Sequence, residues 1–273
     1  MNSRKLETME KSQAAYQLMC SSLEVQMAGK TQTVSLNDNV TIACIIPGSP
    51  YLDTEMMGIR WFYLSQMSKS ESMVFEFHGD NLKSSRPGAM VSPTGLKKGD
   101  ASLQLPKVQL RDEGEYRCEV TVTPQKAEGT ILVKVVALPN SKLFEEKHTV
   151  NNNEEKYLVC EANGFYPPNT NITWEKRLPK VPQFQEVTKD ITRSPLLKNE
   201  DGTFNITSSL NIKSSGEDSG TTYQCVVWHI SLDTPQRYNI TLNGTGAVVT
   251  DFWQHLQGAK LETLKSLETN WKH

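Results

Sequence analysis

Short segments in which hydrophobic and polar residues alternate run through residues 34–136 of the chain. A period of two is typical of strands with one buried face, and turn residues separate these segments. The pattern therefore predicts a sandwich of antiparallel strands. The residues predicted to point inward are Val40, Ile42, Cys44, Ile59, Trp61, Tyr63, Leu103, Leu105, Tyr116, Cys118, Val120, Val122, Ile131, Val133 and Val135.

The second half of the chain repeats the order of marker residues in the first. Cysteine, tryptophan, tyrosine and cysteine occur at 44, 61, 116 and 118, and again as Cys160, Trp174, Tyr223 and Cys225. A length of 273 residues also suits two domains. We predict an all-β fold of two tandem sandwiches, residues 24–137 and 138–244. Residues 1–23 form an atypical N-terminal segment and residues 245–273 a C-terminal tail.

The cysteines support the repeat. Cys44 and Cys118 are separated by nearly the same length of chain as Cys160 and Cys225. A bridge in each sandwich can span the roughly 10 Å between two packed sheets, with the tryptophan packed on it. Cys20 is left over, and we expect it to be free or to belong to a removed segment.

The stretch "DEGEYRC" predicts a tyrosine corner, in which a tyrosine two residues before the second cysteine bonds back to the turn. Here the tyrosine is Tyr116. We expect Asp112 to cap that turn and to pair with Arg86. Asp218 and Tyr223 are the equivalent residues of the second sandwich.

Sequons and cysteine use indicate the secretory pathway. The predicted glycosylation sites are Asn39, Asn171, Asn205, Asn239 and Asn243. Alternation along the strands places the first four on solvent faces. The N-terminal residues lack a clear signal peptide, and no apolar run is long enough for a transmembrane span. A net charge of −2 does not favour a nucleic-acid partner.

Several motifs carry a resemblance to a known family. "GFYP" after Cys160 and the later Trp174 resemble a constant-type immunoglobulin domain, whereas residues 24–137 resemble a variable-type domain with extra edge strands. "LNDNVTIAC", "GEYRCEVTVTP" and "YQCVVWHISLDTP" resemble the costimulatory-ligand and butyrophilin-like branch of the immunoglobulin superfamily.

The resemblance implies an immune-recognition ligand on the external side of the plasma membrane, with no catalysis and no cofactor. Its partner is then an activating receptor of immunoglobulin fold on natural killer cells, not a nucleic acid or a small-molecule substrate. Weak self-association of the chain is left open. The resemblance also implies which residues contact the receptor. For Phe77, packing within an edge strand is as good an explanation as receptor contact. They are Thr123, Pro124, Gln125 and Lys126 at a hairpin tip, Phe77, His78, Gly79 and Asp80 at the next edge, and Tyr51 in a loop.

Other functions are weighed against this one. Catalytic motifs are absent and the histidines are scattered, so we expect neither an enzyme nor a metal site. A second hypothesis is a cell–cell adhesion or T-cell-regulating butyrophilin-like module, or a soluble decoy form. A third is sugar binding, with an outward-facing Arg117 meeting a carboxylate.

Overall fold

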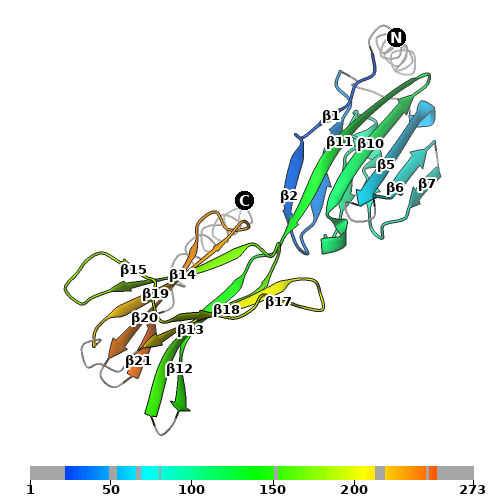
Figure 1. The fold of residues 1–273 in the computed structure, drawn as a ribbon. Helices are drawn as coiled ribbons and strands as arrows, with labels where there is room; N and C mark the ends of the chain where they lie inside the picture. The colour runs from blue at the N-terminus through cyan, green and yellow to red at the C-terminus, as the bar shows by residue number, and fades with distance from the viewer. Residues whose placement is uncertain are drawn as a thin grey trace, which may run out of the picture. The chain divides into compact units, whose positions relative to one another are not determined.

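The structure is a computed structural model that describes residues 22–48, 54–65, 69–79, 81–150, 153–212, 219–243 and 246–250. The chain divides into two compact units, residues 1–136 and 137–273, which are described separately below. Among the described residues, no helix is long and apolar enough to cross a membrane. Both units are built from strands, which confirms the all-β prediction (Figure 1).

The first unit contains a six-stranded sheet with the order β2-β11-β10-β5-β6-β7 (Figure 1). Strand β2 runs parallel to β11, and the other neighbours are antiparallel. The strands are β2 (Thr31–Ser35), β5 (Met57–Ser65), β6 (Glu71–His78), β7 (Asn81–Ser84), β10 (Gly114–Val122) and β11 (Gln125–Val136). Strands β6 and β7 are the extra edge strands that the sequence predicted.

Shorter elements complete the first unit. A three-stranded sheet has the order β3-β9-β8, and β1 pairs with β4. The strands are β1 (Gln26–Met27), β3 (Val40–Ile42), β4 (Cys44–Ile45), β8 (Met90–Val91) and β9 (Leu103–Leu105). The short helices are η1 (Thr54–Met56), α2 (Pro93–Leu96) and η2 (Leu110–Asp112).

The core of the first unit lies around one disulfide. Cys44 is joined to Cys118, and both cysteines and the neighbouring Trp61 are fully buried. The indole Nε1–H of Trp61 donates to the carbonyl oxygen of Ala101 over 2.9 Å. The alternation read from the sequence is confirmed, because the inward residues of β3, β9, β10 and β11 join this core.

The tyrosine corner closes the base of the first sandwich. The Tyr116 hydroxyl donates to the Asp112 carbonyl oxygen over 3.0 Å, and burial is the main cause that raises the pKa of Tyr116. Arg86 donates to both carboxylate oxygens of Asp112, at 2.9 and 2.8 Å. The predicted partners therefore lie together, and the ion pair is largely shielded from water.

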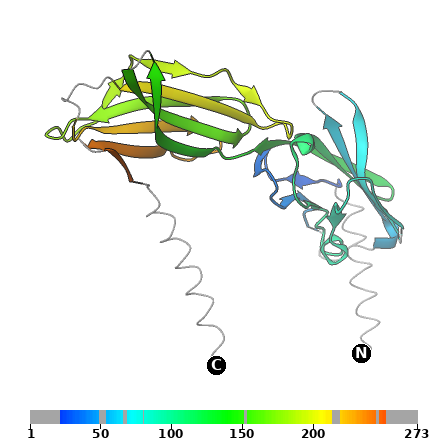
Figure 2. The ribbon, with the colours of Figure 1, turned by 90° about the horizontal axis from the view of Figure 1, so that it is seen from below.

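The second unit consists of two five-stranded sheets, which Figure 2 shows as two layers. One has the order β12-β13-β18-β16, with β17 also paired to β18, and the other has the order β15-β14-β19-β20-β21. The strands of the first are β12 (Asn140–Val150), β13 (Asn153–Phe165), β16 (Ile191–Arg193), β17 (Leu197–Lys198) and β18 (Phe204–Ile212). Those of the second are β14 (Thr170–Arg177), β15 (Gln185–Val187), β19 (Thr222–His229), β20 (Gln236–Asn243) and β21 (Gly246–Thr250).

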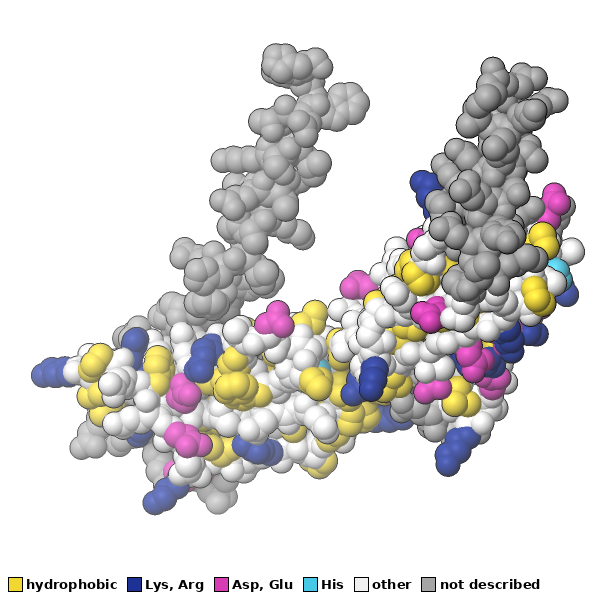
Figure 3. All heavy atoms as spheres, turned by 90° about the horizontal axis from the view of Figure 1, so that it is seen from above, with side chains coloured by type: hydrophobic (Ala, Val, Ile, Leu, Met, Phe, Trp, Pro, Cys, Tyr) yellow, Lys and Arg dark blue, Asp and Glu magenta, His cyan; other side chains and the backbone are white. Residues whose placement is uncertain are grey.

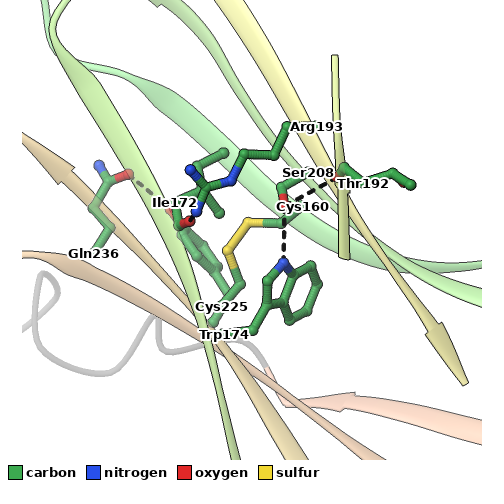
Figure 4. Close-up of a disulfide and its surroundings, with 9 residues drawn as sticks. Cys160, Ile172, Trp174, Thr192, Arg193, Ser208, Cys225 and Gln236 are labelled. Carbon is green, nitrogen blue, oxygen red and sulfur yellow. Dashed lines mark hydrogen bonds between the residues drawn. A yellow bond between two sulfur atoms is a disulfide. The ribbon is translucent and has the colours of Figure 1, made fainter. Parts of the chain in front are cut away.

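A second disulfide joins these two layers. Cys160 in β13 is bonded to Cys225 in β19, and Trp174 lies beside the bridge (Figure 4). Both cysteines and the indole are fully buried. The Trp174 Nε1–H donates to the hydroxyl oxygen of Ser208 over 2.9 Å, so a side chain takes the role that a backbone carbonyl has in the first unit.

Some predictions fall outside the described residues. These are the contact residues Tyr51 and Asp80, the turn residue Asp218, Cys20, and most of the N-terminal segment and C-terminal tail.

Candidate recognition surface

The outward face of the six-stranded sheet in the first unit carries a cluster of charges. Residues of β5, β10 and β11 that alternate with the buried core residues point to this face. Pairing of Cys118 with Trp61 places Glu119 opposite Arg60, and Glu119 is also opposite Glu128 on β11. We call this cluster the front cluster. It consists of Arg60, Phe62, Glu71, Arg117, Glu119, Lys126 and Glu128.

Glu119 is the centre of the front cluster. Its side chain is only 4% exposed, yet it contacts three cations. Lys126 Nζ lies 2.7 Å from Oε2, Arg117 donates to Oε2 over 3.2 Å, and Arg60 donates to Oε1. Burial acts to raise the pKa of Glu119, but the hydrogen bonds from Lys126 and Arg60 outweigh it and lower the pKa. The carboxylate therefore stays ionised and holds the cations in place.

Arg117 joins the outer charges of the front cluster. It donates to Glu71 over 2.8 Å and to Glu128 over 3.1 Å. Its guanidinium also lies 4.3 Å from the ring centroid of Phe62, within cation–π range. Because three carboxylates of the chain already occupy this guanidinium, the structure gives no support to a sugar carboxylate as its partner.

The predicted contact hairpin lies at one end of this face. Thr123 and Pro124 connect β10 to β11 and are exposed, as is Lys126, which follows two residues after Pro124. Gln125 differs. Its side chain is half-buried, and its Oε1 accepts the backbone N–H of Leu23. The hairpin tip therefore leaves three of the four predicted side chains exposed to a partner, while the fourth, Gln125, is hydrogen-bonded to the backbone of Leu23.

On the neighbouring strand β6, the structure supports one of the two alternatives left open for Phe77. Phe77 lies opposite the fully buried Ile59 and packs against the core, so the structure favours edge-strand packing over an exposed contact. His78 is exposed, and Gly79 adopts a positive φ of 57° in the turn after β6. A residue that sequence reasoning missed lies nearer the tip. Met56 is 54% exposed, and its carbonyl oxygen accepts the N–H of Thr123 over 3.4 Å.

The corresponding sheet of the second unit has a different outward face. Arg237 donates to Glu175 over 3.2 Å and to Gln224 over 2.6 Å. Gln224 in turn donates to the amide oxygen of Asn239 over 2.6 Å. These contacts are one ion pair with Arg237, one hydrogen bond from Arg237 to an amide, and one hydrogen bond between two amides. The face therefore lacks a buried charge comparable to Glu119 among the residues the structure describes.

The sequon asparagines have unequal surroundings. Asn39 and Asn171 are exposed, whereas Asn205 and Asn239 are half-buried. The Asn205 amide accepts the N–H of Gly164 over 2.8 Å and exchanges two hydrogen bonds with Asn199, each of 2.9 Å. Alternation along the strand predicted that Asn205 points away from the core. In the structure its side-chain amide is held by hydrogen bonds to Gly164 and Asn199. The side chain of Asn243 lies outside the described residues.

The described part of the chain was also compared with metal-binding and nucleic-acid-binding surfaces. No group of three or more histidine, cysteine, aspartate or glutamate side chains is arranged to hold a metal ion. On the face drawn in Figure 3, acidic, basic and hydrophobic side chains are interspersed rather than gathered by sign. That distribution does not resemble the basic stripe typical of nucleic-acid binding.

Comparison with known proteins places these features in a family. Residues 28–136 match the immunoglobulin V-set domain and residues 142–232 match the immunoglobulin C1-set domain. Natural cytotoxicity triggering receptor 3 ligand 1 of Homo sapiens is 55% identical over 216 residues, which cover 79% of this chain and 47% of that protein. Tapasin-related protein of Mus musculus is 30% identical over 217 residues, covering 78% of this chain and 45% of that protein.

A solved structure shows the same fold. The crystal structure of bovine butyrophilin matches with a TM-score of 0.61 at 18% identity, covering 82% of this chain and all of that one. The chain spans less than half the length of either curated relative. Neither matched domain family is an enzyme family. The chain belongs to the immunoglobulin superfamily and contains a V-set domain followed by a C1-set domain.

Proposed function

We propose that this chain is an extracellular immune-recognition ligand whose V-set domain binds natural cytotoxicity triggering receptor 3, an activating receptor on natural killer cells. The 55% identity to a protein named as a ligand of that receptor supports the partner. The observation that carries the proposal is the exposed hairpin of Thr123, Pro124 and Lys126, which is fastened to the front cluster.

The front cluster prepares the hairpin for binding. Lys126 is 52% exposed, so its ammonium group can bond to Glu119 and still present donors to a partner. Holding a long side chain in place before binding reduces the entropy lost on association by about 0.5–1.5 kcal/mol. Recognition loops carried by a rigid sandwich are a common arrangement. The proposed contact is therefore a preformed tip rather than a segment that orders on binding.

The two disulfides support an extracellular location. Each closes a long loop between sheets, and such bonds persist in oxidising compartments. A receptor with an immunoglobulin fold on an opposing cell is then accessible to the V-set domain. The glycosylation expected at the exposed sequons fits the same location.

Surface plasmon resonance with purified receptor tests the proposal. The full chain should bind, and Lys126→Glu should weaken binding at least about tenfold, or ~1.4 kcal/mol, because it places two carboxylates together at the tip. Lys142→Glu is a matched control in the C1-set domain, where Lys142 is 61% exposed. Absence of binding by the folded chain would refute the proposal. Self-association without receptor binding would instead favour the adhesion hypothesis.

A further inference from the structure

One tryptophan of the C1-set domain is exposed at the end of β19. Trp228 is 48% exposed, and Ile230 close to it is 70% exposed. Trp61 and Trp174 are fully buried by comparison. Both side chains leave apolar surface in water, and an indole that is half exposed offers a flat face on which another apolar group can pack.

The strand pairing around Trp228 explains why one side of its indole ring is exposed. Trp228 points outward from β19, because Val227 and His229 on either side are buried. The pairing of β19 with β20 ends at Val227 opposite Gln236, so no β20 residue lies across from the indole. On the other flank β14 continues, and Asn171 lies directly opposite Trp228.

Asn171 is in a position to carry a group that covers the indole ring of Trp228. It begins the sequon Asn171-Ile172-Thr173 and is exposed. Within the described residues its side chain makes no hydrogen bond, unlike the amides of Asn205 and Asn239. Side chains directly opposite on neighbouring antiparallel strands have Cβ atoms about 4.5–5.5 Å apart. A group attached to Asn171 therefore starts beside the indole ring.

We propose that Asn171 carries an N-linked glycan whose first N-acetylglucosamine lies over the face of Trp228. In the attachment step, Nδ2 of Asn171 forms a bond to C1 of the sugar and loses one proton. The bond from that carbon to a lipid diphosphate donor breaks, and the lipid diphosphate leaves. The C–H face of the sugar then covers the exposed indole, and its polar edge stays in water.

Covalent attachment makes this occupant more favourable than a separate partner protein. A sugar attached beside the ring has a high effective concentration there, so it does not lose the translational and rotational entropy that a separate partner loses on binding. A protein docking on Trp228 would in addition have to avoid the glycan that starts at the opposing residue. The part of the β15-β14-β19-β20-β21 sheet around Asn171 and Trp228 is therefore covered by the glycan.

Site-specific mass spectrometry of the full chain, secreted from mammalian cells behind an added signal peptide, tests both parts. Glycopeptide mapping should find Asn171 occupied. Hydroxyl-radical labelling should then show Trp228 protected, and Thr173→Ala, which removes the sequon, should raise labelling of Trp228 several-fold. Thr173→Ser keeps the sequon and should restore protection, while Asn39→Gln removes a sequon of the other domain and should leave Trp228 unchanged.

Two outcomes overturn the proposal. An unoccupied Asn171 removes the covering group. Equal labelling of Trp228 in the glycosylated chain and in Thr173→Ala shows that the sugar does not lie on the indole, and persistent protection in that variant shows that a protein contact covers it. Trp61, which is buried in either case, serves as an internal reference for folding of the labelled chains.

Discussion

The two domains build corresponding sheets on the same disulfide-and-tryptophan core but give them different outer faces. The V-set sheet carries the buried Glu119 with Arg60, Arg117 and Lys126 around it. The C1-set sheet carries a network of amides around Arg237 and the exposed Trp228. The inward residues thus specify the fold, whereas the outward residues of the same strands give the two sheets different surface chemistry, one charged and one with amides and an exposed aromatic ring.

The interiors also differ in one instructive contact. Trp61 donates to a backbone carbonyl, and Trp174 donates to the hydroxyl of Ser208. A backbone acceptor survives any substitution at its position, but a side-chain acceptor does not. This hydrogen bond of the second core can therefore be removed by substituting Ser208, whereas the one in the first core has no side-chain acceptor to remove.

The largest expected difference between the domains comes from Arg86→Ala. This change leaves the shielded Asp112 carboxylate without its cation and should destabilise the V-set domain by about 3–5 kcal/mol. The C1-set domain should be unaffected. Arg237→Ala is the control, because Arg237 is 43% exposed and its ion pair should contribute less than about 1 kcal/mol. Chemical denaturation followed domain by domain checks both, and similar losses for the two variants would contradict this interpretation.

A smaller effect is expected in the second core. Ser208→Ala removes the acceptor of the buried Trp174 N–H and should destabilise the C1-set domain by about 1–3 kcal/mol. Ser209→Ala, at the next and outward-facing position, should cost less than about 0.5 kcal/mol. Thermal unfolding of both variants provides the measurement. Equal midpoints for the two would show that the indole hydrogen bond does not matter.

Glu119→Gln should weaken receptor binding by about 1 kcal/mol, because Lys126 loses the charge that holds it before binding. Glu115→Gln is a matched control on the same strand, since Glu115 is exposed and lies far from the hairpin tip along β10. Dissociation constants from surface plasmon resonance compare the two. Unchanged affinity for Glu119→Gln would indicate that the hairpin does not depend on the front cluster.

The smallest expected effect is on the pH dependence of V-set stability. The pKa of Glu119 is lower in the folded chain than its ordinary value of about 4.3. Its ion pairs therefore stabilise the domain above that value, and the stabilisation is lost as pH falls through the lowered folded pKa. Unfolding measured between neutral and acidic pH should show this loss in the V-set domain, and Glu119→Gln should reduce it. An identical acid profile for the variant would contradict the assignment.

The sequence predicted what is local and periodic. Alternation along strands identified the inward residues, because that signal lies within a few residues. The repeated order of cysteine, tryptophan, tyrosine and cysteine then indicated the two sandwiches. The front cluster could have been predicted one step further. Once Cys118 is placed opposite Trp61, Glu119 must lie opposite Arg60.

Other contacts could not be read from the sequence, because their partners are distant along the chain. The Gln125 side chain is held by the backbone of Leu23, and the Asn205 amide is held partly by Gly164. Phe77 was ambiguous because the sequence does not show how β6 is paired with β5. Only the register with Ile59 shows that it faces the core.

Hydrogen exchange of the glycosylated chain, with and without bound receptor, compares the two sheets in one experiment. Binding should slow amide exchange in the hairpin from Thr121 to Lys126 and leave β14, β19 and β20 unchanged. Slowed exchange in β14 and β19, with none in the hairpin, would contradict the assignment of the V-set face to the receptor and the C1-set face to the glycan.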